Sequence, residues 1–247
     1  MTLTDYLVYL VQKEVVFMNI QGLQKLTLLD YPGKMACIVF TGGCNLRCPF
    51  CHNASIVLNP SAEGEFSVDE ITDFLKKRQG VLEGVVITGG EPLMQKDIAE
   101  FIEKVRSLGY SVKLDTNGTY PDKLKELIDK GLVDYVAMDI KASPAGYPPA
   151  VGIGGYDISK IAKSVKLLLE GRVDYEFRTT VVREFHSVFS MKELGEFIRG
   201  AKRHYLQGFK DSGELIGFGL SAVPKNEMEE MRKILLNYVE NCELRGV

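Results

Sequence analysis

The sequence has no long apolar run and no block of basic residues. The apolar stretches near its start are interrupted by Asp5, Lys13 and Glu14 and are too short to span a bilayer. Lys and Arg number 30 against 33 Asp and Glu, which gives a formal net charge of -3 and no basic surface for nucleic acid or an anionic membrane. The start also has no basic leader and no Ala-x-Ala-like cleavage site. We therefore expect a cytoplasmic protein with no nucleic-acid partner and no membrane partner.

Cysteine is scarce, with five residues in a chain of 247. Thiols stay reduced in the cytoplasm, so these cysteines predict metal or redox ligands or ordinary buried residues, and not a disulfide scaffold. The chain also lacks internal repeats, low-complexity tracts and a Pro/Ser-rich linker. The Gly/Pro-rich stretch 143–157 is expected to be a long loop, with a mobile lid as one interpretation.

A chain of this length can form one domain, and we expect residues 18–247 to do so. Residues 1–17 are expected to be an N-terminal extension of that domain. They are either a short helix on the surface or a segment upstream of a natural start at Met18, and the sequence leaves both alternatives open.

Apolar runs of strand length alternate with amphipathic runs of helical period from Met35 onward, which predicts about six strand–helix units. Ser67 precedes one helical run and Glu70 follows three positions later, a spacing typical of a capping box. The predicted strands lie at 35–43, 83–90, 110–118, 133–141, 174–182 and 204–210, and the predicted helices at 67–80, 94–109, 120–131, 157–171, 190–203 and 226–244.

Such an order requires an α/β fold with parallel strands and right-handed crossovers, either as an open doubly wound sheet or as a full or partial barrel. In each of these architectures, ligands bind at the carboxyl ends of the strands. Four glycine-rich or polar segments fall at those ends, and together they are called the rim below. The rim consists of TGGC (41–44), TGGEP (88–92), DTNG (115–118) and MDIK (138–141).

Three cysteines, Cys44, Cys48 and Cys51, lie in one C-x3-C-x2-C segment directly after a predicted strand. Thiolates suit zinc or an iron-sulfur cluster, and this spacing lets one loop surround a single metal centre. A closed zinc site needs a fourth ligand. His52 is a poor candidate for it, because adjacent residues rarely converge on one tetrahedral ion.

The other two cysteines are poorly placed to complete a set of four. Cys37 lies in an apolar strand, where a thiol usually behaves as a small hydrophobic group, and Cys242 lies in the predicted C-terminal helix. An electron-transfer 4Fe-4S cluster needs four cysteines, whereas a cluster with three cysteine ligands would leave one iron open to a small molecule. Unliganded thiols or a degenerate zinc knuckle are the alternative interpretation.

The segment CNLRCPFC (44–51) resembles the cluster loop of the radical S-adenosylmethionine (SAM) superfamily. Residues 18–53 resemble the opening of the activating proteins of anaerobic ribonucleoside-triphosphate reductase, and the resemblance covers most of the chain from there on. It implies a partial (β/α)6 TIM-like barrel, one 4Fe-4S cluster on Cys44, Cys48 and Cys51, and SAM on the open iron. It also implies that an electron from the cluster cleaves the sulfonium bond of SAM and generates a 5'-deoxyadenosyl radical.

The same resemblance implies roles for residues near the cysteines. Gly89, Gly90 and Glu91 match the GGEP motif of the superfamily, which binds the methionine amino group of SAM. A common turn is the alternative interpretation of this motif. Phe50 and His52 flank the cluster and are expected to lie against the adenine, with a packed aromatic as the alternative for Phe50.

Charged residues on the later strands are expected to bind SAM and a cation. Asp139 and Lys141 are two positions apart and therefore share one face of a strand. By resemblance, Lys141 contacts SAM, and Asp115, Thr116 and Asp139 hold a monovalent cation beside it. An ion pair between Asp139 and Lys141 would explain both charges without a ligand. Arg178 is expected either to reach the SAM carboxylate or ribose or to form a structural salt bridge.

We expect an activase that abstracts a hydrogen atom from a backbone glycine of a large partner enzyme and leaves a glycyl radical there. The resemblance implies anaerobic ribonucleoside-triphosphate reductase as the partner. It also implies reduced flavodoxin or ferredoxin as the electron donor, because five cysteines cannot supply a ferredoxin-like module.

Two alternatives stay open: radical SAM chemistry on another glycyl radical enzyme or a small molecule, and a non-catalytic iron-sulfur or zinc-binding module. Some relatives place a ligand-contacting histidine after the sixth strand. Here His204 lies at the wrong end of that strand and Lys210 near the expected place, so we assign neither a role.

Overall fold

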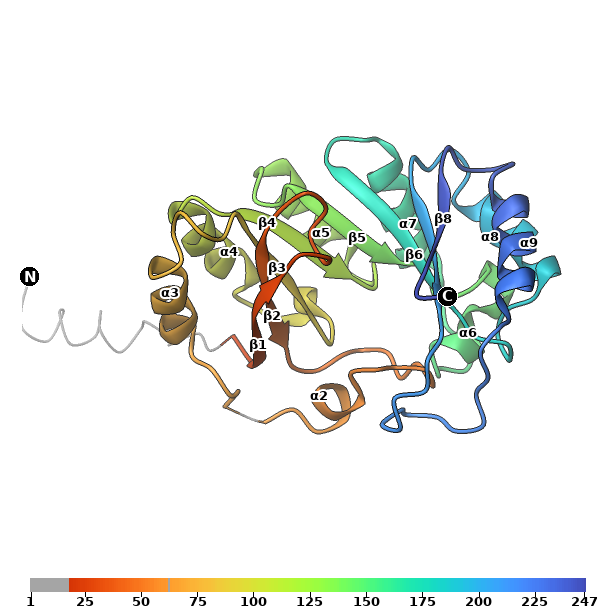
Figure 1. Cartoon of the computed structure of the whole chain (residues 1–247), viewed down its shortest axis with the longest axis horizontal. Coiled ribbons are helices and arrows are strands. Elements are labelled where there is room, and N and C mark those ends of the chain that lie inside the picture. Colours follow the sequence, from red (N-terminus) through yellow and green to blue (C-terminus); the bar gives the residue numbers. More distant parts are fainter. Residues whose placement is uncertain (1–17, 62) are drawn as a thin grey trace, which may run out of the picture.

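The strands form one curved, open sheet (Figure 1). The computed structural model describes residues 18–61 and 63–247, so the expectation for residues 1–17 lies outside the described residues. Eight strands lie side by side in chain order, the first pair antiparallel and every later pair parallel. They are β1 (Ile20–Thr27), β2 (Ala36–Thr41), β3 (Gly84–Gly89), β4 (Ser111–Thr116), β5 (Tyr135–Asp139), β6 (Asp174–Val181), β7 (His204–Gly208) and β8 (Cys242–Arg245).

Most of the helices follow the strands along the outer side of the sheet, and the short helix at Ala54–Leu58 lies apart from them (Figure 1). Strands β2 to β7 and six of these helices form the six predicted strand–helix units, so the prediction of an α/β fold with a partial barrel is confirmed. The helices are α2 (Ala54–Leu58), α3 (Val68–Lys76), α4 (Ile98–Ser107), α5 (Pro121–Asp129), α6 (Tyr147–Ala150), α7 (Ser159–Leu169), α8 (Val188–Phe197) and α9 (Lys225–Leu235), with short 3-10 segments η1 (Pro92–Met94) and η2 (Pro144–Gly146).

The start of α3 shows why these segments become helices. The Ser67 side chain accepts a hydrogen bond from the Glu70 backbone N–H, and the Glu70 carboxylate accepts one from the Ser67 backbone N–H. The predicted capping box is therefore confirmed. Ile71 and Leu75 follow one turn apart on the same side of the helix, and both are buried.

The two faces of the sheet differ, because successive side chains of a strand point to opposite faces. In β3, Val85 and Ile87 belong to the main core, whereas Val86 belongs to a second, small cluster with Ile38 and Tyr135. Toward the carboxyl ends of the strands, the residues on the same face as Val86 are polar and line a cavity. The candidate site is therefore built on the inner side of the sheet, at the rim.

The two edge strands, β1 and β8, were not predicted. The helical pattern was expected to reach residue 244, but α9 ends at Leu235 and Cys242 begins β8 instead. The correction has a physical reason: the chain turns after the helix, and Cys242 pairs with His204 in a parallel ladder that satisfies its backbone groups. Among the described residues no ladder joins β1 to β8, so the barrel does not close.

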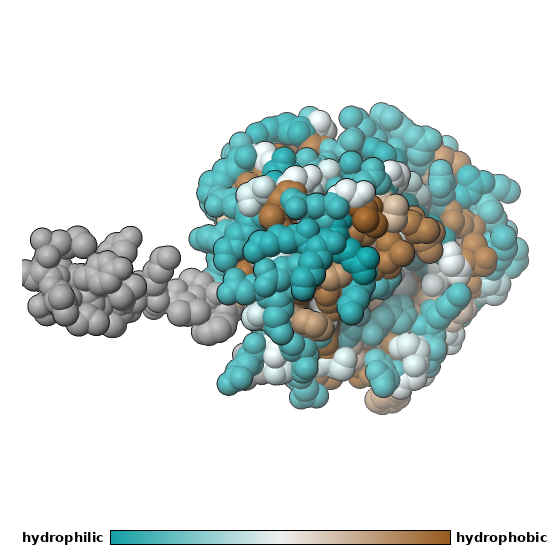
Figure 2. Space-filling model, turned by 60° about the vertical axis from the view of Figure 1, so that its left-hand side comes forward, coloured by the Kyte–Doolittle hydropathy of each residue, from teal (hydrophilic) through white to brown (hydrophobic). Residues whose placement is uncertain are grey.

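The face of the molecule drawn in Figure 2 is mostly hydrophilic. Figure 2 shows one face of the molecule, on which smaller hydrophobic areas lie between hydrophilic side chains. Exposed apolar residues include Leu28 and Leu29 in the β1–β2 connection and Phe218 in the loop after β7. Every helix in the described part of the chain is too short or too polar to cross a membrane.

Candidate functional site

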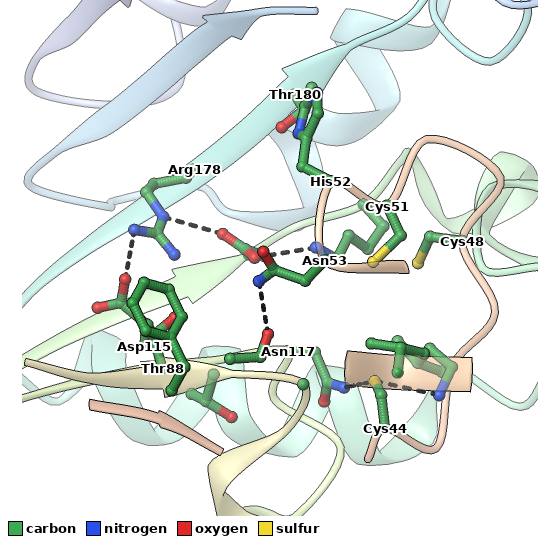
Figure 3. Close-up of a pocket in the computed structure, with 18 of the residues that line it drawn as sticks. Cys44, Cys48, Cys51, His52, Asn53, Thr88, Asp115, Asn117, Arg178 and Thr180 are labelled. Carbon is green, nitrogen blue, oxygen red and sulfur yellow. Dashed lines mark hydrogen bonds and ion pairs between the residues drawn. The ribbon is translucent and has the colours of Figure 1, made fainter. Parts of the chain in front are cut away.

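The C-x3-C-x2-C segment forms a loop between β2 and α2, and its three cysteines line one cavity of about 450 Å³ (Figure 3). Cys37 and Cys242 are buried elsewhere, in β2 and β8. Among the described residues, no group of three or more His, Cys, Asp or Glu side chains converges on a point that could hold one metal ion. The cavity wall also includes most of the predicted site residues: Phe50, His52, Gly89, Gly90, Asp115, Thr116, Asp139, Lys141 and Arg178.

Two glycine motifs of the rim lock together through their backbones. Gly90 N donates to Thr41 O at 2.8 Å, and Glu91 N donates to Gly43 O at 2.9 Å. A Cβ added at Gly90 would lie 1.8 Å from the Gly43 carbonyl oxygen, and one at Gly89 would lie 2.3 Å from the Thr41 backbone. Gly89 also has a φ of 118°, which other residues rarely adopt. This contact, called the backbone interlock below, therefore requires glycine at both positions.

The cysteine side chains are held in a partly buried setting. Burial raises the pKa of Cys48 to about 12, although the Lys141 ammonium acts in the opposite direction. Burial also raises the pKa of Cys44, against the effect of a hydrogen bond from the Leu46 backbone N–H. At neutral pH these thiols are therefore protonated, and a metal centre could bind them as thiolates only if it displaced the protons.

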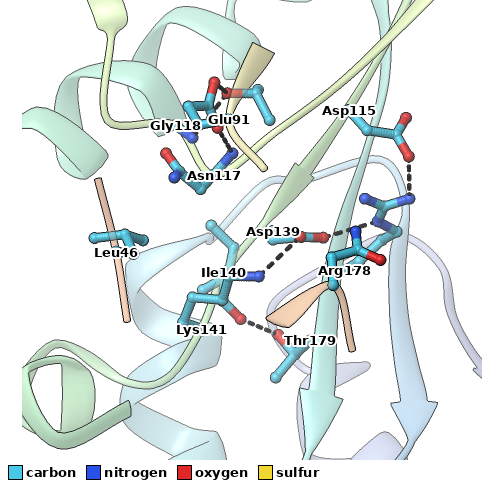
Figure 4. Close-up of polar contacts among 12 residues, drawn as sticks. Leu46, Glu91, Asp115, Asn117, Gly118, Asp139, Ile140, Lys141, Arg178 and Thr179 are labelled. Atoms are coloured by element: carbon cyan, nitrogen blue, oxygen red, sulfur yellow. Dashed lines mark hydrogen bonds and ion pairs between the residues drawn. The ribbon is translucent and has the colours of Figure 1, made fainter. Parts of the chain in front are cut away.

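Ion pairs join five charged side chains in or just after β4 to β6, four of which are labelled in Figure 4: Asp115, Asp139, Lys141 and Arg178. Arg178 lies between two carboxylates: its Nη1 is 2.8 Å from Asp115 Oδ2 and its Nε is 2.9 Å from Asp139 Oδ1. Lys141 Nζ is 2.9 Å from Asp139 Oδ2, and the Lys113 ammonium pairs with Asp115. Burial alone would raise the pKa of Asp139, but Arg178 and Lys141 outweigh it and hold that pKa well below its usual range.

These contacts concern two expectations from the sequence: that Lys141 and Arg178 contact SAM, and that a monovalent cation lies beside it. The structure contains both the ion pair between Asp139 and Lys141 and the salt bridges of Arg178 that were the alternatives to ligand contacts, yet all three side chains also line the cavity. A guanidinium already lies between Asp115 and Asp139, and the Thr116 hydroxyl donates to Glu91 at 2.7 Å. The Arg178 guanidinium and the Thr116–Glu91 contact therefore use the atoms expected to hold a monovalent cation, and the cation at Asp115, Thr116 and Asp139 stays a prediction.

Glu91 lies behind the cavity wall, not in it. Its carboxylate is fully buried and accepts hydrogen bonds from the Thr116 hydroxyl, the Asn117 backbone N–H and the Leu93 backbone N–H at 2.7, 2.7 and 3.1 Å. Burial raises the pKa of Glu91 to about 7, although these three donors act in the opposite direction. The side chain was expected to accept from an ammonium group of the ligand, but here it holds the turn after β4.

Phe50 and His52 lie on either side of Cys51 and contact other loops. The Phe50 ring packs against Phe185, with 5.6 Å between ring centroids. The His52 ring stacks on Phe209, and its Nε2 lies 2.7 Å from the carbonyl oxygen of Lys210. A carbonyl can only accept, so Nε2 carries the proton in this contact. The loop after β7 therefore packs against the cysteine loop, an arrangement that the sequence did not indicate.

Some residues of the site were not recognised in the sequence. Thr180 and Gln207 line the cavity from β6 and β7, and strand alternation could have found them, because Thr180 is two positions after Arg178. The Nε2 atom of His186 lies 3.0 Å from the carbonyl oxygen of Lys141. His186 is buried in the loop after β6 and holds the Lys141 backbone. The local sequence pattern does not predict this contact.

Comparison with known families and relatives agrees with this arrangement. The sequence profile of the Radical SAM superfamily matches residues 38–186. A protein of Methanocaldococcus jannaschii, whose name provisionally describes it as a glycyl-radical enzyme activating enzyme, is 33% identical over 237 residues and covers 92% of this chain and 96% of its own. A 7-carboxy-7-deazaguanine synthase of Hyperthermus butylicus is 38% identical over 107 residues, which are 43% of this chain and 42% of the synthase.

A solved structure supports the fold. Streptococcus suis SuiB, bound to its precursor peptide SuiA, superposes with a TM-score of 0.67 over 85% of this chain and 48% of SuiB. The two sequences are 15% identical. The likeness therefore concerns the arrangement of strands and helices.

Gly90→Ala is expected to displace the cysteine loop. The added Cβ would clash with the Gly43 carbonyl oxygen at 1.8 Å, so one of the two backbones must move. We expect the free energy of unfolding to fall by about 1–3 kcal/mol, as for other overpacked sites, measured by urea unfolding. Cys48 should also react faster with a thiol reagent, because it is buried in the native loop.

Gly154→Ala is the matched control, since a Cβ added at Gly154 meets nothing within 4 Å. Its free energy of unfolding should stay within about 0.5 kcal/mol of the wild type. Equal behaviour of the two variants would show that the backbone interlock does not hold the cysteine loop.

Proposed function

Because the chain belongs to the radical SAM superfamily, we propose that Cys44, Cys48 and Cys51 hold one 4Fe-4S cluster and that the adjoining cavity binds SAM. The residues fit both groups. The three thiols line the same cavity, whose volume of about 450 Å³ lies in the usual range for small-molecule sites. Three thiols would leave one iron without a protein ligand, and SAM would bind there.

The charges around the cavity suit one end of SAM, which carries a carboxylate and an amino group. Three cationic and two anionic side chains, those of Lys113, Lys141, Arg178, Asp115 and Asp139, leave a net charge of +1. A net positive, partly buried cluster favours an anionic group. Lys141 and Arg178 line the cavity and would donate to the SAM carboxylate, with Asp139 keeping both side chains in place.

The backbone at the end of β3 would face the amino group of SAM. Gly89 and Gly90 both line the cavity and present no side chain there, so a ligand can approach their carbonyl groups closely. Glu91 would act from behind as a positioning residue. Phe50 and His52 border the same cavity and would lie against the adenine, where the packed Phe50 ring also excludes water.

A bound cluster, once reduced by one electron, would supply the electron that splits a carbon–sulfur bond of SAM, giving methionine and a 5'-deoxyadenosyl radical. The chain has five cysteines, three of them in the proposed cluster site, so the electron must come from another protein. We propose reduced flavodoxin or ferredoxin as that donor and the cytoplasm as the compartment.

We further propose that the radical is used to abstract a hydrogen atom from a glycine of a partner protein. The observation that carries this proposal is the extent of similarity: the Methanocaldococcus jannaschii protein matches 92% of this chain, whereas the Hyperthermus butylicus synthase matches 43%. The open sheet supports it, because no ladder joins β1 to β8 in the part of the chain that the structure describes, and a protein segment could enter between these two strands.

Among glycyl radical enzymes, we propose anaerobic ribonucleoside-triphosphate reductase as the partner. Residues 18–53, which include β1, β2 and the cysteine loop, resemble the opening of its activating proteins. A different glycyl radical enzyme is the nearest alternative. Synthesis of a small molecule, 7-carboxy-7-deazaguanine, is the second candidate because of the similarity over 107 residues.

The cluster and its reaction are tested together with two cysteine variants. The protein is purified without oxygen, reconstituted with iron and sulfide, reduced with dithionite and mixed with SAM, and 5'-deoxyadenosine is measured by chromatography. We expect product from the wild type and from Cys242→Ala, whose thiol is buried in β8. Cys48→Ala should lose both bound iron and product.

The absence of product from a fully loaded wild-type protein would contradict the enzymatic proposal. Equal loss of iron in Cys48→Ala and Cys242→Ala would contradict the assignment of the cluster ligands.

The partner is tested by electron paramagnetic resonance. On mixing the reduced protein and SAM with the large subunit of the reductase from the same organism, we expect the doublet of a glycyl radical. The control is a reductase whose radical-bearing glycine is replaced by alanine, which should give no doublet.

Other outcomes would point to other substrates. A doublet only with another glycyl radical enzyme would exclude the reductase as the partner. Formation of 7-carboxy-7-deazaguanine from its precursor, without any protein radical, would favour the second candidate.

A further inference from the structure

We propose that Asn117 donates a hydrogen bond to the sulfur of Cys44 and thereby raises the reduction potential of the cluster. The inference rests on the proposed function, because it needs a 4Fe-4S cluster on Cys44. The Nδ2 atom of Asn117 lies 3.6 Å from Sγ of Cys44, a separation suited to an N–H···S contact, since sulfur is larger than oxygen (Figure 3).

The orientation of the Asn117 amide follows from its other contacts. Its Oδ1 accepts hydrogen bonds from the Thr119 backbone N–H at 3.0 Å and from the Thr119 hydroxyl at 2.6 Å. A backbone N–H can only donate, so the amide oxygen must face Thr119 and the NH2 group must face the other way. There the NH2 group donates to Asn45 Oδ1 at 3.1 Å and to Cys44. These contacts therefore require that the nitrogen atom of the amide, and not its oxygen atom, faces the sulfur of Cys44.

The turn that carries Asn117 is held by two hydrogen bonds, and Figure 4 shows Glu91 beside this turn. The Glu91 carboxylate accepts from the Asn117 backbone N–H at 2.7 Å, and the Ser164 hydroxyl donates to the Gly118 carbonyl at 2.7 Å. Gly118 has a φ of 76°, and a Cβ there would lie 2.1 Å from the methyl group of Met138. The backbone therefore cannot relax easily, and the buried Asn117 side chain is preorganised toward Cys44.

The expected effect on the potential follows from charge. Reduction moves one electron from the external donor to the cluster and increases the negative charge on its thiolate ligands. An N–H dipole aimed at one of these sulfurs stabilises the reduced state more than the oxidised state, so it raises the potential. Within residues 18–61 and 63–247, Cys44 is the one proposed ligand with a side-chain donor at its sulfur, and the Leu46 backbone N–H adds a second donor at 3.4 Å.

The test compares midpoint potentials of the loaded holoprotein in an anaerobic redox titration followed by electron paramagnetic resonance. In Asn117→Ala the N–H donor is lost, and we expect the affinity of the cluster for the electron to fall roughly tenfold, which is about 59 mV for a one-electron couple. Asn117→Asp keeps the shape of the side chain and an acceptor for Thr119 but has no donor. Its potential should fall at least as far, because a carboxylate also repels the added charge.

Ser164→Ala is the matched control. It removes an anchor of the same turn, the hydrogen bond to Gly118, but leaves the amide of Asn117 intact. We expect its potential to equal that of the wild type. A loaded Asn117→Ala protein with the wild-type potential, or an equal shift in Ser164→Ala, would overturn the inference. Failure of the wild-type protein itself to bind a cluster would instead refute the proposed function, and with it the premise of the inference.

A second measurement detects the contact in the wild-type protein itself. The wild-type protein is labelled with nitrogen-15 in its asparagine side-chain amides, and the reduced cluster is studied by pulsed electron paramagnetic resonance. We expect a nitrogen-15 coupling to the cluster that disappears in Asn117→Asp. A wild-type spectrum without this coupling would overturn the inference.

Discussion

The close contact of two backbones, at residues 41–44 and 89–91, is the constraint on which the rest of the site depends. Gly90 and Glu91 donate to the chain just before the cysteine loop, and the glycines leave no room for any side chain between the two segments. The same Glu91 then uses its carboxylate to hold the turn after β4. A single chain of contacts therefore runs from the cysteines through the end of β3 to Asn117, and displacement of one member would move the others.

The charges around the cavity determine which ligands it can bind. Isolated charges in a partly buried corner would be costly, and here each of the two carboxylates is shared by two cationic side chains. The balance nevertheless stays positive by one charge, and Lys141 and Arg178 face the cavity beside the three thiols. Soft ligands on one wall and cations on another are the combination that a metal cluster and a small zwitterionic ligand with a carboxylate would need.

Much of this arrangement could be predicted from the sequence, because parallel strands bring their carboxyl ends together whatever the details of packing. That rule placed the four segments of the rim around one cavity and placed Cys44, Cys48 and Cys51 in it. It could not predict β8. The four residues of this strand follow α9, and they form a strand because they pair with β7, which is a tertiary contact. Likewise, the local sequence does not show that Glu91 turns away from the cavity, since two of its three hydrogen-bond partners lie 25 and 26 residues further along the chain.

The central claim is that three cysteines hold a four-iron cluster and leave one iron for SAM. Mössbauer spectroscopy of the protein reconstituted with iron-57 tests it most directly, because the method distinguishes iron sites by their ligands. We expect the addition of SAM to change the signal of one iron in four and to leave the other three as they were. A spectrum in which all four sites stay the same in the presence of bound SAM would contradict it.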